Sequence, residues 1–266
     1  MSPAPNSPAV LHVDQLSLAV DGLLLLDNLS LSVAPGEILS IIGPNGAGKS
    51  SLLRAIGGDL PISRGQVQLC GQPIGALAPL ARARQMAILA QRNHLEFAFT
   101  GLEVVAMSRT PHATGAHLDE EICHAAMAAL DVGHLAGRLY PLLSGGEQQR
   151  IHLARVLAQI WRAEDAGQRL LLLDEPVTSL DIGHQWQCMQ AVRDLAGTGV
   201  AVLMTLHDMT LAGAFSDRLI ALSGGRCCAQ GTPEQVLTAA VINPLFATRV
   251  CVVSHPVTGK PVVINE

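Results

Sequence analysis

The sequence of 266 residues contains no long hydrophobic run, although 49% of its residues are hydrophobic and its mean hydropathy is +0.34. A helix that crosses a membrane needs about 20 consecutive apolar residues. The longest uncharged stretches are short, as at 195–206, or are broken by Gly, Pro or Gln, as at 65–81. We therefore expect a globular protein with an unusually apolar interior and no membrane-spanning helix.

Charged and aromatic residues are also scarce. The chain has 17 Lys and Arg against 22 Asp and Glu, a formal charge of −5, and only 3% aromatic residues. Proteins that bind nucleic acids carry a surplus of positive charge, and those that bind single strands need aromatic stacking platforms. No nucleic-acid partner is expected. Disorder is excluded as well, because disordered chains are poor in apolar residues.

Cysteine and histidine patterns typical of metal sites are missing. No CxxC pair occurs among the cysteines, which are Cys70, Cys123, Cys188, Cys227, Cys228 and Cys251. We expect buried, reduced thiols rather than disulfides or a zinc site. His112, His117 and His124 are expected at the surface. Residues 1–9 have neither the basic start nor the apolar core of an export signal, so we expect a short disordered lead there.

The remaining pattern predicts an α/β fold. Short strands are expected at 11–33 (two, around Asp21-Gly22), 37–42, 65–71, 170–173, 200–205 and 218–222, with two more in the tail. Helices are expected at 49–56, 118–130, 145–160, 185–195 and 209–215. Strands that alternate with helices favour a parallel sheet, and fully apolar runs favour strands buried on both faces. Residues 93–141 are predicted to form a helical insertion.

A glycine-rich loop follows the strand at 37–42 and opens the helix at 49–56. Its residues are Gly43, Pro44, Asn45, Gly46, Ala47, Gly48, Lys49 and Ser50, with Ser51 behind them. Glycines let successive N–H groups turn toward phosphate oxygens, and the helix start adds positive potential. Lys49 is expected to reach the β- and γ-phosphates of a nucleotide, and Ser50 to bind magnesium.

Two carboxylates, Asp174 and Glu175, end the leucine strand at 170–173. The carboxyl ends of parallel strands lie at one edge of a sheet, so these side chains should face the phosphate loop. Asp174 is predicted to hold Mg²⁺ through water. Glu175 is predicted to polarise an attacking water as the general base.

Residues 143–150, Leu-Ser-Gly-Gly-Glu-Gln-Gln-Arg, resemble the signature of ATP-binding-cassette (ABC) ATPases. The resemblance covers essentially the whole chain. Ser144 can cap a helix whose N–H groups Gly145 and Gly146 expose, which makes a second anion site. The resemblance implies a homodimer in which Ser144, Gly145, Gly146 and Glu147 of one subunit close over the γ-phosphate of ATP held by the other.

The same resemblance assigns further residues and an architecture. Gln91 is implied to contact magnesium and to couple to a membrane partner, His207 to contact the γ-phosphate, and Asp181 to communicate across the dimer. The implied fold is a P-loop NTPase (RecA-like) core at 10–92 and 146–240, with an antiparallel β subdomain. A helical subdomain with the signature occupies 93–145, and a C-terminal extension occupies 241–266. Val20 stands where the family often has an adenine-stacking aromatic residue, so adenine should be held more loosely.

The family resemblance also implies partners. The helical subdomain is expected to dock on two membrane permease subunits at the cytoplasmic face of the bacterial inner membrane, and a periplasmic or surface substrate-binding protein is expected to act indirectly. Phe97 and Phe99 either pack this subdomain or leave one ring to line an apolar docking groove.

Five stretches resemble the ATPase subunits of bacterial haem (hemin) importers: 106–112, 140–150, 154–159, 161–169 and 254–260. Importers of ferric siderophores or of cobalamin remain alternatives. Exporters, and the soluble ABC ATPases of DNA repair or ribosomes, are remoter ones. The repair type has long coiled coils and the ribosomal type has two cassettes in one chain, and neither feature is present here.

Overall fold

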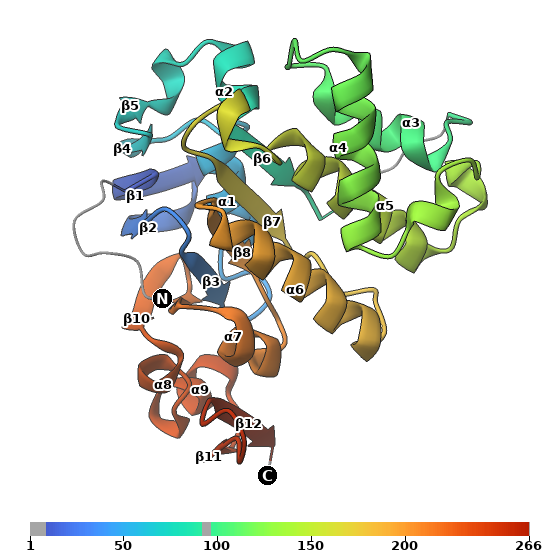
Figure 1. Ribbon diagram of the computed structural model, residues 1–266. Helices are drawn as coiled ribbons and strands as arrows, with labels where there is room; N and C mark the ends of the chain where they lie inside the picture. Colours follow the sequence, from blue (N-terminus) through green and yellow to red (C-terminus); the bar gives the residue numbers. More distant parts are fainter. Residues whose placement is uncertain (1–8, 92–96, 266) are drawn as a thin grey trace.

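The computed structural model describes residues 9–91 and 97–265, and its largest sheet has six strands (Figure 1). The expected lead, apart from Ala9, and the start of the expected insertion at 93–96 lie outside the described residues. In sheet order the strands are β10 (Arg226–Gly231), β9 (Arg218–Ser223), β3 (Ile38–Ile42), β8 (Ala201–Thr205), β7 (Leu170–Asp174) and β6 (Met86–Leu89). All neighbours are parallel except β10, which pairs antiparallel with β9 at the edge.

A second sheet of four antiparallel strands covers one side of this core (Figure 1). Its strands are β2 (Leu23–Val33), β1 (Leu11–Val20), β4 (Arg64–Leu69) and β5 (Gln72–Pro73). Helix α1 (Lys49–Gly57) contributes Leu52 and Ile56 to the apolar cluster between the two sheets, beside Leu39 of β3 and Leu172 of β7. This cluster fixes the helix that begins at Lys49 against both sheets.

The helices on the other side share the larger apolar core. In the view of Figure 1 the insertion lies to the right, where α3 and α4 pack against α5, which also contacts β6. The helices are α2 (Pro79–Gln85), α3 (Gly101–Ala106), α4 (Ala116–Ala129), α5 (Gly145–Gln159), α6 (Ile182–Gly197), α7 (Met209–Phe215), α8 (Pro233–Val236) and α9 (Ala239–Phe246). Short 3-10 helices occur at Ile74–Ala76, Met107–Arg109, Gly133–Leu135, Tyr140–Leu142 and Ala163–Asp165.

The C-terminal extension ends in a hairpin of β11 (Val250–Ser254) and β12 (Pro261–Asn265), which packs against α7 and α9. The predicted pair of tail strands is therefore confirmed. In the described part of the chain, every helix is too short or too polar to cross a membrane.

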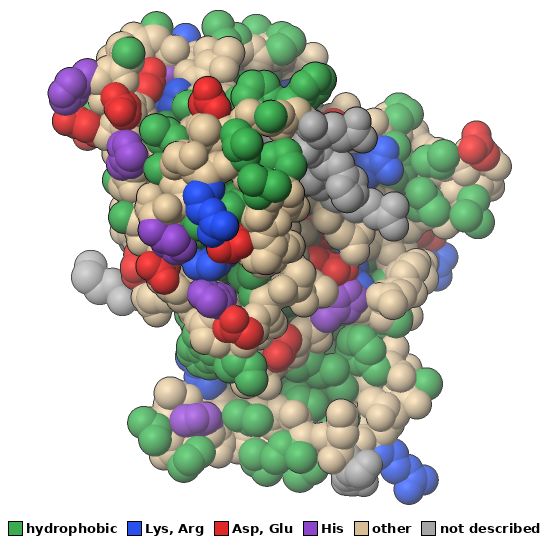
Figure 2. Space-filling view, turned by 90° about the vertical axis from the view of Figure 1, so that its right-hand side faces the viewer, with side chains coloured by type: hydrophobic (Ala, Val, Ile, Leu, Met, Phe, Trp, Pro, Cys, Tyr) green, Lys and Arg blue, Asp and Glu red, His purple; other side chains and the backbone are tan. Residues whose placement is uncertain are grey.

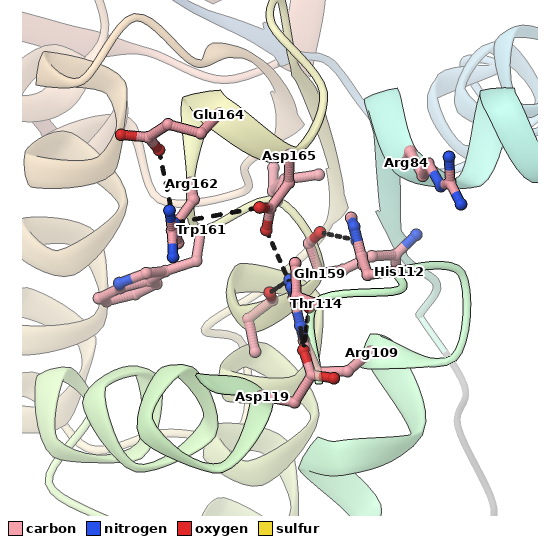
Figure 3. Close-up of polar contacts among 12 residues, drawn as sticks. Arg84, Arg109, His112, Thr114, Asp119, Gln159, Trp161, Arg162, Glu164 and Asp165 are labelled. Atoms are coloured by element: carbon pink, nitrogen blue, oxygen red, sulfur yellow. Dashed lines mark hydrogen bonds and ion pairs between the residues drawn. The ribbon is translucent and has the colours of Figure 1, made fainter. Parts of the chain in front are cut away.

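One buried ion cluster ties the polar stretch 161–169 to the helical insertion (Figure 3). The Arg109 side chain is 3% exposed; its Nε lies 2.7 Å from Asp119 Oδ1 and its Nη2 lies 2.8 Å from Asp165 Oδ2. Nη1 donates to the carbonyl oxygen of Ala158 at 2.9 Å. Two of the stretches that resemble hemin-importer ATPases, 106–112 and 161–169, thus meet in this cluster.

His112 lies beside that cluster, half-buried, with Nε2 2.8 Å from the carbonyl oxygen of Gln159 (Figure 3). Burial, and secondly the charge of Arg109, lower the pKa of His112. The expectation of a surface histidine is therefore wrong for His112. It is confirmed for His117 and His124, whose side chains are 90% and 50% exposed.

The expectation of buried thiols is only partly confirmed. Cys123 and Cys188 are buried, and burial raises the pKa of their thiols to about 11 and about 12. Cys227, Cys228 and Cys251 are exposed instead, because they lie on strands at the edges of sheets. All six cysteines are free.

Candidate functional site

The glycine-rich loop joins the buried strand β3 to α1, as the sequence predicts. Gly46 and Gly48 have φ of 78° and 102°, a region that favours glycine. A Cβ on Gly43 would lie 2.2 Å from the carbonyl oxygen of Leu222. Gly48 caps α1 without a side-chain hydrogen bond, so no side chain competes for the first N–H groups of the helix. The loop can therefore present these N–H groups to phosphate oxygens.

Lys49 lies at the mouth of this loop. Its Nζ donates to the carbonyl oxygens of Gly43 at 2.7 Å and of Pro44 at 3.0 Å. Burial lowers the pKa of Lys49, while the negative charges of Glu175 and Asp174 act in the opposite direction. The two carboxylates therefore favour the charged ammonium that a phosphate group requires.

A cavity of about 280 Å³ lies over the loop. It is lined by Leu25, Asn45, Gly46, Ala47, Gly48, Lys49, Ser50, Ser51, Gln91 and Glu175. The fold thus brings most of the predicted nucleotide loop to one space with Gln91, which follows β6, and Glu175, which follows β7. Leu25 of β2 was not among the predicted residues, and no local sequence motif singles it out.

Glu175 is the centre of a hydrogen-bonded group at this cavity. Its Oε1 lies 2.5 Å from Nε2 of His207, and its Oε2 accepts from Nε2 of Gln91 at 3.3 Å. The Glu175 side chain is 10% exposed and that of His207 37%. Residues separated by up to 116 positions in the sequence (91 and 207) therefore share one carboxylate. A carboxylate in this position can accept a proton from a water bound near the loop.

Asp174 and Glu175 are held by Thr205, a residue that the sequence analysis missed. Thr205 Oγ1 donates to Asp174 Oδ1 at 2.7 Å and accepts from the backbone N–H of Glu175 at 2.9 Å. Asp174 pairs with Thr205 in the parallel register of β7 and β8. One signal in the sequence could have identified it. Thr205 is a hydroxyl residue at the end of the strand predicted at 200–205, and the carboxyl ends of neighbouring parallel strands lie at the same edge of a sheet.

The oxygen donors here fit Mg²⁺. The hydroxyl of Ser50, the amide of Gln91 and the carboxylate of Asp174 are hard ligands, and magnesium in nucleotide sites takes one or two carboxylates together with phosphate oxygens. Within residues 9–91 and 97–265, no group of three or more His, Cys, Asp or Glu could hold a metal alone. Any magnesium at this site would therefore depend on the nucleotide for the rest of its ligands.

The signature residues form a separate, exposed helix start. Ser144 caps α5 in a reciprocal box: its Oγ accepts from the N–H of Glu147 at 3.4 Å, and Glu147 Oε2 accepts from the N–H of Ser144 at 2.7 Å. These bonds to Ser144 lower the pKa of Glu147. The predicted helix cap is therefore confirmed, but Ser144, Gly145, Gly146 and Glu147 do not line the nucleotide cavity.

Asp181 is likewise outside that cavity. It caps α6 by accepting from the N–H of His184 at 3.0 Å, and its side chain is 68% exposed. The structure therefore brings the loop residues, Gln91 and Glu175 together around one cavity. Asp181 and the start of the signature helix lie outside it and are exposed, so another molecule can contact them.

Comparison with known proteins decides the family. A family model described as "ABC transporter" matches residues 26–178. The chain belongs to this family. This ABC protein is 49% identical over 257 residues to the hemin import ATP-binding protein HmuV of Pseudomonas entomophila, covering 97% of the chain and 100% of the relative. It is 45% identical to the protein of the same name from Gloeobacter violaceus, covering 94% and 91%.

Solved structures confirm the fold of this cassette. It superposes on a chain of a metal-chelate type ABC transporter in an inward-facing conformation with a TM-score of 0.80 and 24% identity, covering 97% of each chain. With the ADP conformation of MJ1267, an ATP-binding cassette, the TM-score is 0.77 at 21% identity, covering 91% and 98%. The expected P-loop NTPase core with a β subdomain and a helical subdomain is confirmed. The chain is an ATP-binding subunit with ATPase activity.

Proposed function

We propose that this chain is the ATP-hydrolysing subunit of a hemin importer. The observation that carries the ATPase assignment is the Glu175 carboxylate, shared by Gln91 and His207, beside the phosphate loop. The hemin assignment is supported by relatives between 45% and 49% identical that are named hemin import ATP-binding proteins. A ferric siderophore or cobalamin is the second candidate cargo.

The subunit acts as a head-to-tail homodimer in this proposal. Ser144, Gly145, Gly146 and Glu147 are kept apart from the nucleotide cavity, and Ser144 and Gly145 are exposed. A helix start of this kind binds anions, so it suits the γ-phosphate held by a second copy. Asp181, also exposed, would lie at the same junction. Two ATP molecules would then close the two subunits together.

Hydrolysis is assigned to residues around the nucleotide cavity. The loop from Gly43 to Ser51 binds the phosphates, and the Lys49 ammonium stabilises their charge. Glu175 takes a proton from the attacking water, and His207 exchanges its bond with Glu175 for one with the γ-phosphate. Ser50, Gln91 and Asp174 would hold Mg²⁺, which neutralises charge on the β- and γ-phosphates when bound.

A membrane permease supplies the translocation pathway, since an importer's ATP-binding subunit works with membrane subunits. We place two permease subunits on the helical insertions of the dimer, at the cytoplasmic face of the bacterial inner membrane. A substrate-binding protein would deliver the cargo from outside. Phe97 is 70% exposed, and its ring centroid is 6.0 Å from that of Phe99, which packs on the large core. One ring therefore packs and the other is available for docking.

A polar cavity of about 400 Å³ lined by charged residues also lies at this docking face. It lies between the core and the insertion, and its walls contain Arg82 of α2, Arg155 of α5 and one carboxylate, Asp59. Among the described residues, neither arginine has a carboxylate within ion-pair distance, and Nε of Arg155 is buried without a hydrogen-bond partner. An acidic side chain of the permease suits this position.

Changing Phe97 to Ser should weaken permease binding about thirtyfold, and so reduce its co-purification, while leaving ATP binding by the isolated subunit unchanged. The exposed ring would lose about 2 kcal/mol of burial at the interface. Val257→Ser is the matched control, because Val257 is 86% exposed on the C-terminal hairpin. Detergent-extracted complexes, quantified by subunit ratio, provide the measurement. Full permease recovery with Phe97→Ser would remove Phe97 from the docking face.

An aromatic ring at position 20 should tighten ATP binding. Val20 ends β1, pairs with Leu23 of β2 and packs partly on the core between the sheets. An added ring at the adenine position is worth about 1 kcal/mol, or roughly fivefold in affinity. Val20→Tyr should therefore lower the Kd for ATP about fivefold by calorimetry, whereas Val257→Tyr should not. An unchanged Kd would place the base elsewhere.

The cargo is tested by uptake into proteoliposomes that contain the dimer, its cognate permease and the binding protein. ATP-dependent uptake of hemin, without uptake of ferric siderophore or cobalamin, is the expected result. Preferred uptake of either competitor would overturn the hemin assignment. If the subunit hydrolysed ATP at the same rate with and without the permease, the result would argue for a function outside transport.

A further inference from the structure

A cavity of about 510 Å³ separates α6 and α7 from the C-terminal hairpin, and none of the roles above uses it. Trp186 of α6 lies in its wall and packs on the buried Phe215 at the end of α7, with ring centroids 4.9 Å apart and planes at 59°. Trp186 is 46% exposed, and Val262 of β12 lies in the facing wall. In Figure 2, hydrophobic side chains gather where the molecule narrows above the C-terminal extension.

The charges around this cavity favour an anion. Arg193 is neutralised by Asp217, with Nη1 3.0 Å from Oδ2. Lys260 donates to the carbonyl oxygen of Ala214, and no carboxylate of the residues described here lies within ion-pair distance of it. Glu234 interacts with the Lys260 charge only at longer range. The ammonium of Lys260 therefore keeps donors and charge for a bound ligand.

His255 adds a directed donor to the same wall. Its Nδ1 accepts from the N–H groups of Val257 and Thr258, both at 3.2 Å. In the neutral ring the proton is then on Nε2, which can donate to a carboxylate but cannot ligate iron. The site offers one aromatic face and hydrogen-bond donors, but no metal ligand from this histidine.

We propose that this cavity binds a planar aromatic carboxylate of the porphyrin type. The porphyrin would stack on the exposed ring of Trp186, and a carboxylate would take a charge-assisted bond from Lys260 and a bond from His255. The volume is in the range of small-molecule sites, about 300–1,000 Å³. The choice of a porphyrin among aromatic carboxylates rests on the proposed hemin function, since the imported cargo is released on this side of the membrane.

The position of the cavity connects it to the catalytic residues. Helix α6 begins directly after Asp181, and α7 begins at Met209, two residues after His207. A ligand that contacts Trp186 and Thr210 holds these two helices at their present separation, in which His207 is bonded to Glu175. Because His207 must leave Glu175 to contact the γ-phosphate, the bound ligand inhibits hydrolysis. Binding of imported porphyrin at this site would thus lower the rate of ATP hydrolysis and of further import.

The binding test uses Trp161→Phe, which leaves Trp186 as the only one of the two tryptophans. Titration of the full-length dimer with protoporphyrin IX should quench Trp186 fluorescence saturably. Lys260→Gln in this background should weaken binding about tenfold, as loss of a charged hydrogen bond predicts. Arg249→Gln, which removes an exposed charge of the same extension outside the cavity, should not. Non-saturable quenching, or equal affinity for the two charge variants, overturns the site.

Two further readouts complete the test. Hemin and protoporphyrin IX should bind with similar affinity, and a strong preference for hemin would overturn the carboxylate assignment. Saturating protoporphyrin IX should lower ATP turnover about fivefold, an ordinary coupling between two sites; unchanged turnover refutes the coupling to His207. Ala214→Leu, which narrows the cavity, should weaken the inhibition while the melting temperature shows that the protein remains folded. Failed hemin uptake with intact protoporphyrin binding would refute the proposed cargo alone, whereas intact uptake without binding would refute this site alone.

Discussion

Replacing Glu175 with Gln is expected to lower the rate of ATP hydrolysis by about a thousandfold without loss of ATP binding. A general base contributes about 10²- to 10⁴-fold, and a neutral amide cannot accept the proton of the attacking water. The substitution keeps the size of the side chain, so the contacts with Gln91 and His207 can persist in altered form. With ATP bound but not hydrolysed, the variant should accumulate as a closed dimer.

Two measurements test this expectation. Phosphate release gives the turnover, and size-exclusion chromatography with light scattering gives the fraction of dimer in the presence of ATP. Glu120→Gln on α4 is the matched control, because that carboxylate is 66% exposed and far from the nucleotide loop in sequence and fold. Turnover at the wild-type rate in Glu175→Gln would exclude Glu175 as the base.

Removing the Arg109 charge is expected to destabilise the protein by about 3–5 kcal/mol, the usual result of breaking a buried ion pair. Arg109→Met would leave Asp165, 6% exposed, and Asp119, 22% exposed, without the cation that lies between them. The carbonyl oxygen of Ala158 would lose its donor as well. During unfolding, the helical insertion should separate from the stretch that carries Asp165 before the rest of the protein unfolds.

Urea unfolding followed by tryptophan fluorescence measures this loss, since Trp161 lies at the start of the same stretch (Figure 3). Arg162→Met is the control: its side chain is 33% exposed, its shorter ion pair at 3.4 Å is with the exposed Glu164, and its contact with Asp165 is 4.0 Å long, so a change below about 1 kcal/mol is expected. Asp165→Asn added to Arg109→Met should restore part of the stability. A loss below 1 kcal/mol for Arg109→Met would show that the cluster does not hold the two segments together.

Most strands of the core were predictable because each is a short apolar run that is buried on both faces. The four leucines of β7 and the residues of β8 are completely buried, as predicted. Two edge strands were missed. Strand β6 was missed although its four residues, Met86–Leu89, are all apolar, because a run this short with no β-branched residue except Ile88 does not distinguish a strand from a helix. Strand β10 is largely exposed and carries no apolar pattern. Helix α2 has no buried residue and left no signal either.

The candidate site was predictable where its parts are consecutive residues. The loop Gly43–Ser50, the cap at Ser144 and the acids Asp174 and Glu175 each depend on local backbone geometry, which a short sequence encodes. The family resemblance supplied Gln91 and His207, which the fold brings to the same carboxylate. Thr205 was missed because its role depends on the register of two strands.

The sequence by itself thus determined the family, the nucleotide loop and the apolar parallel core, because these follow from local motifs and from hydrophobic pattern. Only the tertiary structure decided which scarce aromatic residues are exposed. Phe99 is packed while Phe97 is not, and Trp186 packs on Phe215 beside the C-terminal cavity. It also decided that Arg109 joins Asp119 and Asp165. These contacts join residues distant in sequence, and their energies depend on burial that only the folded chain provides.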